Sequence, residues 1–186
     1  MGRPPRIDRD AVITHALELA DQEDIASVTM AAVAARLRVT PMALYRHVAN
    51  KDDLLDGLVE RLLAEIADQV ALTATDSLET AVRRFALAAG RTASTHPVTF
   101  PLLLARPART DTSRLVREQV YSLLRRSGVP EDRVRDVERL VTTTVLGMAA
   151  GHASRRFPVP SEDTEESTTR FVVSALNAFI ANGRPQ

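Results

Sequence analysis

Apolar residues recur every three to four positions through most of the 186-residue chain, which is the spacing of an amphipathic α-helix. The pattern is clearest between Leu54 and Val70, where the apolar residues keep to one helical face. No segment alternates apolar and polar residues as a half-buried strand does, and no internal repeat is found. The pattern therefore predicts an all-α fold of about nine helices.

The predicted helices divide the chain into four parts. Residues 1–7, with two prolines and two arginines, form a flexible basic arm. Residues 8–50 hold three short helices, residues 51–72 form one long linking helix, and residues 73–186 form the remaining helices. These last helices are expected over Ser77 to Thr95, a short stretch before Pro107, Asp111 to Ser127, Pro130 to Arg156 and about Glu165 to Ala181.

Composition excludes several classes of protein. The chain has no cysteine, so it has no disulfide framework, no thiolate zinc site and no cysteine nucleophile. Its 45% of hydrophobic and 26% of charged residues are typical of a globular protein. No run of about 18 apolar residues is present, and no apolar stretch follows the basic N-terminus as it does in a signal peptide. We therefore expect a soluble, cytoplasmic protein without a membrane partner.

Residues 29–50 follow a helix-turn-helix pattern. One helix is predicted over Met30–Leu37, a three-residue break follows, and a second helix is predicted over Pro41–Val48. The second helix has only two residues of core type, Leu44 and Val48, which pack it against the first. Its other face is free, and a helix with a free face fits the major groove of DNA and reads bases from its first residues.

The free face carries side chains suited to DNA. Met42 and Ala43 offer apolar contacts to thymine methyl groups, and Arg46 can pair with guanine or grip a phosphate. Lys51 and the free amides at the start of the next helix form an anion site that suits a phosphate. The sequence therefore predicts double-stranded DNA as a partner, with contacts from Thr29, Thr40, Pro41, Met42, Ala43, Tyr45, Arg46, His47 and Lys51.

The residues of this region resemble one known family. The stretches TMAAVAARL (Thr29–Leu37) and PMALYRHVANKDDLL (Pro41–Leu55) are similar to the tetracycline-repressor (TetR) family, and the second is closest to the tetracycline repressors themselves. The resemblance covers about residues 8–67. It implies a homodimer whose subunits have a three-helix DNA-binding head, a linking fourth helix and a helical core that binds a small molecule.

The resemblance also implies a function. Ligand binding in the core moves the two heads apart and releases DNA, so we expect a ligand-responsive regulator, most commonly a repressor, with a pseudo-palindromic operator. Three positions depart from the family pattern. Arg38 replaces the usual glycine of the turn, and Asp24 replaces another glycine before the second helix. Ala31 stands where tetracycline repressors have a base-reading arginine, so the operator should differ.

The core of such a protein should bind the effector and form the dimer. The last two long helices, over residues 130–156 and 165–181, are expected to pair across the dimer. The small residues between Val141 and Gly151 permit this close approach, although they also suit a core within one subunit. The effector is an unknown molecule of apolar or mixed character. Its predicted pocket is lined by Phe85, Phe100, Leu103, Val120, Tyr121, Leu124, Val141 and Thr144.

Net charge does not by itself indicate DNA binding. The chain has 24 basic and 24 acidic residues, and its first 75 residues carry an excess of acidic groups. The positions of the charges must therefore decide. The arm has Arg3 and Arg6, which can either reach a minor groove or remain solvated.

Two other functional classes fit the sequence less well. The chain has no phosphate loop, nucleophile elbow or cluster of His, Asp and Glu, so we expect no enzyme activity, no cofactor and no metal site. The first histidine of the tetracycline–magnesium site in tetracycline repressors falls near Ala67 here. His96 suits a helix end or a contact to the ligand. A pure protein-interaction bundle would leave the exposed residues Tyr45, Arg46 and His47 without a role.

Overall fold

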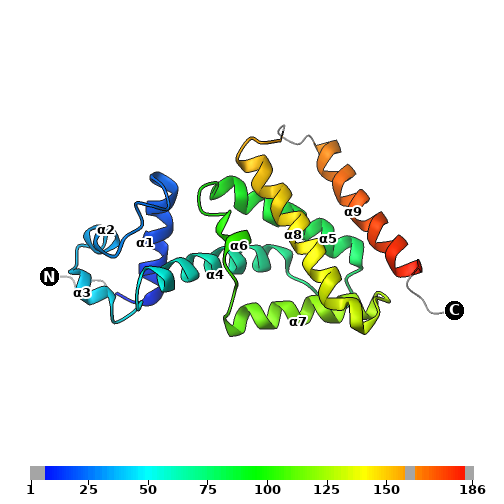
Figure 1. The fold of residues 1–186 in the computed structure, drawn as a ribbon, viewed down its shortest axis with the longest axis horizontal. Coiled ribbons are helices and arrows are strands. Elements are labelled where there is room, and N and C mark those ends of the chain that lie inside the picture. The colour runs from blue at the N-terminus through cyan, green and yellow to red at the C-terminus, as the bar shows by residue number, and fades with distance from the viewer. Residues whose placement is uncertain (1–6, 158–161, 183–186) are drawn as a thin grey trace. The chain divides into compact units, whose positions relative to one another are not determined.

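The structure, a computed structural model, describes residues 7–157 and 162–182, and every regular element within these ranges is helical (Figure 1). The expected all-α fold is confirmed, while the arm, apart from Ile7, lies outside the described residues. No helix in the described part of the chain is long and apolar enough to cross a membrane. The elements are α1 (Arg9–Gln22), α2 (Met30–Arg36), α3 (Pro41–Leu44), α4 (Lys51–Val70), α5 (Leu78–Thr95), α6 (Leu102–Ala105), α7 (Asp111–Arg126), a 3₁₀ turn (Glu131–Arg133), α8 (Val134–Ala153) and α9 (Glu162–Asn182).

The helices form two units. Unit 1 comprises Met1–Leu62 and Val98–Ala108, and unit 2 comprises Leu63–Pro97 and Arg109–Gln186. Helix α4 contributes its residues up to Leu62 to unit 1 and its later residues to unit 2. Each unit has an apolar core of its own.

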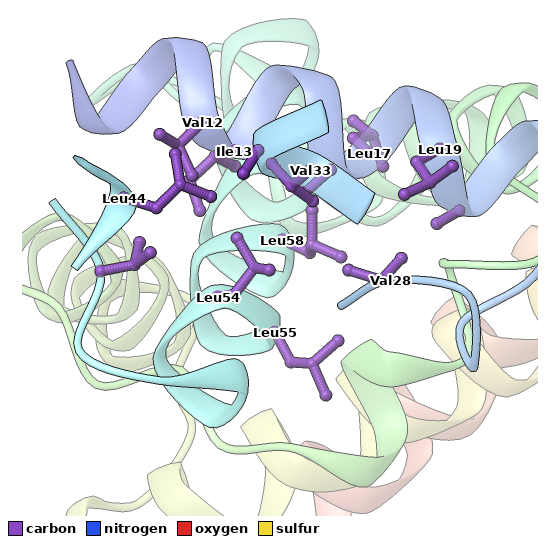
Figure 2. Close-up of a cluster of buried hydrophobic side chains, with 14 of the residues drawn as sticks. Val12, Ile13, Leu17, Leu19, Val28, Val33, Leu44, Leu54, Leu55 and Leu58 are labelled. Carbon is purple, nitrogen blue, oxygen red and sulfur yellow. The ribbon is translucent and has the colours of Figure 1, made fainter. Parts of the chain in front are cut away.

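The core of unit 1 is one apolar cluster to which four helices contribute. Val12 and Leu17 of α1, Val33 of α2, Leu44 of α3 and Leu58 of α4 converge on it, and all five are buried (Figure 2). Burial of each such side chain stabilises the fold by about 1.5–3 kcal/mol. Helices as short as α2 and α3 are not stable by themselves, so this shared cluster holds them.

A segment that follows α5 in the chain completes unit 1. Within Val98–Ala108, Phe100 is fully buried, and Leu103 packs against the unit 1 cluster. The Thr99 hydroxyl donates to the Asp21 carboxylate of α1 at 3.2 Å. Apolar and polar contacts therefore both fasten this segment to the helices of unit 1.

Helix α5 is the central helix of unit 2. It packs against both α8 and α9, and α7 packs against α8 (Figure 1). One cluster of buried residues joins these helices, with Leu78 from α5, Leu124 from α7, Val137 from α8 and Leu176 from α9. The last two helices are thus both fixed through α5.

Within the described residues, helices α2, α7 and α8 end in the same hydrogen-bonded turn, the Schellman motif. After α2, the N–H groups of Arg38 and Val39 donate to carbonyl groups one turn back. The motif places one residue in the left-handed region, and Arg38 occupies that position with φ 57°. The equivalent residues after α7 and α8 are Gly128 and Arg155. Arg38 therefore keeps the turn for which glycine is the favoured residue.

Some helix bounds differ from the sequence prediction. Helix α3 ends at Leu44 instead of Val48, because the next turn tightens and the His47 N–H donates to the Leu44 carbonyl, three residues back, at 2.8 Å. The helix expected to open at Pro130 begins with the 3₁₀ turn, and its regular part starts at Val134. Local tightening of this kind depends on backbone hydrogen bonds that apolar periodicity does not reveal.

A substitution at Arg38 can measure the free-energy cost of its left-handed backbone conformation. A left-handed conformation costs a non-glycine residue roughly 1–2 kcal/mol. The greater freedom of glycine in the unfolded chain offsets about 0.5–1 kcal/mol of that gain. We therefore expect Arg38→Gly to raise the free energy of unfolding by about 0.5–1 kcal/mol in a urea titration. Arg38→Ala is the control, because it removes the same side chain and keeps the strain. An equal gain in Arg38→Ala would show that the side chain, and not the backbone, causes the effect.

Candidate functional site

Helices α2 and α3 form the predicted helix-turn-helix. Leu44 and Val48 are fully buried and belong to the same cluster as Val33, and Leu37 and Val39 pack against that cluster. These are the contacts that the sequence predicts for the second helix. Two anchoring side chains are enough to hold α3, so the rest of its surface remains available.

The available surface of α3 and the turn after it carries large side chains. Met42 is 72% exposed and Tyr45 is 50% exposed. Arg46 is exposed as well, whereas Ala43 and His47 are half-buried. Large apolar and aromatic groups at a surface mark a contact site, and here a cationic group accompanies them. The other predicted contacts on this surface are also exposed: Thr29, Thr40, Pro41 and Lys51.

Arg9 of α1 holds the turn after α3. Its guanidinium donates to the two carboxylate oxygens of Asp53 at 2.6 and 3.1 Å, and to the His47 carbonyl at 2.9 Å. Asp53 also accepts the Ala49 N–H at 2.7 Å. The hydrogen bond from Arg9 lowers the pKa of Asp53 below its ordinary value, so the pair remains charged at neutral pH. This clamp fixes the turn that carries Tyr45 to both α1 and α4.

The start of α4 is capped and leaves a cation at the surface. The Asn50 side chain accepts the Asp53 N–H at 2.9 Å. Lys51 is exposed, and its Nζ donates to the Ala26 carbonyl at 3.4 Å. The N-terminus of a helix favours anions through its free amides and its dipole. This end of α4 can therefore bind a phosphate, as the sequence predicts.

Ion pairs in unit 1 account for many of the acidic groups that make the N-terminal part of the chain negative. Carboxylates of α1 and α4 pair with arginines, while Arg38 and Arg46 have no ion-pair partner among the described residues. Uncompensated positive charge therefore lies in the turns before and after α3. The pairs are Asp10 with Arg61, Glu18 with Arg36, Asp53 with Arg9, and Asp52 and Asp56 with Arg106.

The sequence does not indicate the contacts that two arginines make in the site. Arg9 is 44 positions from Asp53, and Arg106 is 50 positions from Asp56. No local spacing indicates pairs so far apart. Asp53, in contrast, has a local signal, because it lies three positions after Asn50, which is the spacing of a capping box.

The eight predicted pocket residues fall in two groups. Six belong to unit 2: Leu124 is part of its apolar cluster, Val120, Tyr121 and Val141 pack against that cluster, and Phe85 and Thr144 are half-buried. Phe100 and Leu103 belong to unit 1.

Unit 2 also contains pairs of interacting polar side chains. The His96 Nε2 lies 3.3 Å from the Glu65 carboxylate, and Gln69 donates to the hydroxyl of the buried Thr92 at 3.4 Å. His96 also ends α5, which confirms its expected place at a helix end. Within the described residues, no group of three or more His, Asp or Glu is placed to hold a metal ion.

Comparison with known proteins identifies the region. Residues 12–58 match the family described as "Bacterial regulatory proteins, tetR family". This match includes α2, α3 and the start of α4, which are the elements of the exposed surface described above.

Two relatives that match most of the chain are less than 30% identical to it, and a third matches a shorter part at higher identity. The HTH-type transcriptional repressor DrrR1 of Streptomyces coeruleorubidus is 27% identical over 98% of this chain and 68% of its own length. An HTH-type transcriptional regulator of Saccharopolyspora erythraea is 25% identical over 80% of this chain, which spans only 62% of that relative. The tetracycline repressor protein class D of Escherichia coli is 35% identical over 44% of this chain and 38% of its own length.

Solved structures agree on the fold. ActR from Streptomyces coelicolor, in complex with actinorhodin, has a TM-score of 0.79 and 19% identity, covering 96% of this chain and 100% of that one. BioQ with its double-stranded DNA operator has a TM-score of 0.73 and 24% identity, covering 93% and 99%. The family match thus places residues 12–58 in the tetR family of bacterial regulatory proteins, and the solved structures show that the chain shares the fold of ActR and BioQ.

Proposed function

We propose that this chain is a cytoplasmic transcription regulator that represses its target, binds a pseudo-palindromic operator as a homodimer and is released by a small molecule. The observation that carries the proposal is the surface of α3. Leu44 and Val48 anchor the helix, and Met42, Tyr45 and Arg46 remain exposed beside uncompensated positive charge. That combination suits the major groove, where apolar and guanidinium groups read bases.

The relatives support the same proposal. The relative from S. coeruleorubidus is named a repressor, BioQ was solved with its operator, and ActR was solved with actinorhodin. We propose the division of labour expected from the sequence, with the DNA-binding head at residues 8–50, the linking helix at residues 51–72, and the effector and dimerisation core at residues 73–186. No catalytic role and no cofactor are part of the proposal.

Dimer formation is supported by unpartnered apolar side chains on α8 and α9. Phe171 is 75% exposed and Leu140 is 64% exposed, although each helix also has buried residues that face α5. Exposed apolar groups of this size are costly in a monomer. Two copies of such a face can pair around a twofold axis and cover each other.

Effector binding is supported by four of the predicted pocket residues, Val120, Tyr121, Leu124 and Val141, which lie in or against one apolar cluster of unit 2. Helix α4 runs without a break from Lys51 to Val70, so the same helix carries the predicted phosphate contact and residues of unit 2. A ligand acts on DNA only through its different affinity for two conformations. A movement of α4 is the simplest conformational difference that would affect both the Lys51 end of the helix and its residues in unit 2.

The DNA contacts are tested with two substitutions that should behave differently. A phosphate contact contributes to all sequences, whereas a base contact sets the preference. We expect Lys51→Ala to weaken binding to an operator and to random duplex alike, by about tenfold, and to reduce the salt slope by about one. Met42→Ala should instead change the preferred sequence at the α3 contact. Fluorescence anisotropy over a salt series, on duplexes selected from a random pool, measures both effects.

The control for this pair is Arg61→Ala, which removes a cation from the same helix ten positions away. Its effect on DNA affinity should be within about twofold, since screening limits charge effects beyond roughly 10 Å. Unchanged binding in both Lys51→Ala and Tyr45→Phe would contradict the proposed docking.

The dimer is tested by placing charge on the exposed face of α9. Phe171→Asp adds a carboxylate that would be buried without a partner in a dimer interface, and such burial costs several kcal/mol. We expect the mass in light scattering to fall from that of a dimer to that of a monomer at micromolar concentration. Leu115→Asp is the matched control, because Leu115 is 68% exposed and lies on α7. A monomeric wild-type chain, or a dimeric Phe171→Asp variant, would contradict the interface.

The effector pocket is tested by filling it. Thr144→Trp inserts a large side chain among the predicted pocket residues, so it should either mimic a bound effector or prevent one from binding. The expected change in operator affinity corresponds to about 1–3 kcal/mol, the usual range of allosteric coupling. Thr143→Trp is the control, because Thr143 is exposed on the same helix. If a compound that occupies the core by calorimetry leaves operator affinity unchanged, release by that compound is disproved.

A further inference from the structure

Arg106 lies in the segment of unit 1 that follows α5, yet it contacts the beginning of α4. Its Nε donates to the Asp56 carboxylate at 2.8 Å. Its terminal nitrogen donates to the Asp52 carboxylate and to the Asp52 carbonyl, both at 3.2 Å. Asp52 and Asp56 are four residues apart and therefore share one face of the helix. One guanidinium thus bridges two carboxylates on the first turns of α4.

These carboxylates present a difficulty for DNA binding. Asp52 and Asp53 follow directly after Lys51, and Asp56 comes one turn later, so three negative charges lie at the end of α4 that is proposed to meet a phosphate. Acidic residues in the first turn favour the helix itself through its dipole. They also repel an approaching phosphate, and a single lysine cannot offset three of them.

Two arginines from outside α4 compensate all three carboxylates. Arg9 pairs with Asp53, and Arg106 pairs with Asp52 and Asp56. Arg9 also holds the turn after α3 through the His47 carbonyl, so its loss would disturb the recognition helix directly. Arg106 is bonded to α4 alone among these elements, which makes it the cleaner probe of charge.

We infer that Arg106 is a positioning residue for DNA binding: by neutralising Asp52 and Asp56 it preserves the attraction of the Lys51 end of α4 for phosphate. The inference rests on the proposed DNA-binding function and adds a residue from outside the helix-turn-helix. Arg106 acts through the carboxylates and needs no contact with DNA.

A purely structural role is the competing explanation. Asp52 is 81% exposed, and ion pairs at such positions contribute little to folding stability. Leu103 packs against the unit 1 cluster and Phe100 is fully buried, so the segment is held by apolar contacts as well as by Arg106. The fold should therefore tolerate loss of the arginine, and the two explanations can be separated by charge.

The experiment measures binding of the full chain to a selected duplex and to a 30-base-pair random duplex, by anisotropy at several salt concentrations. Arg106→Gln should weaken binding to both duplexes by about five- to twentyfold at low salt, and the loss should shrink as salt rises. Arg106→Lys keeps the charge and should remain within about twofold of wild type. Arg61→Gln, which breaks the Asp10 pair farther along α4, is the matched control and should also remain within about twofold.

Charge rescue decides between the explanations. Removing both carboxylates in Arg106→Gln/Asp52→Asn/Asp56→Asn should restore wild-type affinity if Arg106 acts by neutralisation. It should leave binding weak if Arg106 acts as a mechanical fastening. Asp52→Asn/Asp56→Asn with Arg106 intact should bind both duplexes more tightly than wild type, which keeps the test decisive even if Arg106→Gln does not fold.

The outcomes separate this inference from the proposed function. A wild-type chain that binds neither duplex overturns the proposed function. A wild-type chain that binds, together with an Arg106→Gln variant of unchanged affinity or with a triple variant that is not rescued, overturns the role of Arg106 alone.

Discussion

The helix-turn-helix depends on one packing constraint: α3 must be held firmly while burying almost nothing. Leu44 and Val48 are its anchors, and both are buried in a cluster to which α1, α2 and α4 also contribute. A four-residue helix has too few hydrogen bonds to persist alone, so the cluster must supply its stability. If the core buried more of α3, less of the surface of this helix would remain for a partner.

Polar contacts in the turns around α3 also hold the helix, and they do so without burying its surface. The turn after α3 has no apolar residue to hold it before Val48, and the Arg9–Asp53 pair fixes it instead by binding the His47 carbonyl and the Ala49 N–H. On the preceding turn, the left-handed Arg38 closes the helix with a cation where family members usually have glycine. In each turn an arginine therefore takes part in fixing the backbone: Arg9 does so within an ion pair, and Arg38 does so while adding a positive charge.

The sequence predicts the local part of this arrangement well and the distant part poorly. The apolar period locates α2 and α4, and two apolar residues identify the anchors of α3, because these signals act within a few residues. The pairing of Arg9 with Asp53 and of Arg106 with Asp52 depends on how distant segments pack, and no spacing encodes it. The predicted pocket likewise draws on distant segments: Phe100 and Leu103 belong to unit 1, and the other six residues belong to unit 2.

The insertion of Val98–Ala108 into unit 1 makes that unit discontinuous along the chain. An N-terminal fragment that stops at the end of α4 contains the whole helix-turn-helix but lacks Phe100, Leu103 and the guanidinium that balances Asp52. During synthesis on a ribosome, the first helices emerge well before the residues that complete their core. Unit 1 can therefore gain these contacts only after all of α5 has been synthesised.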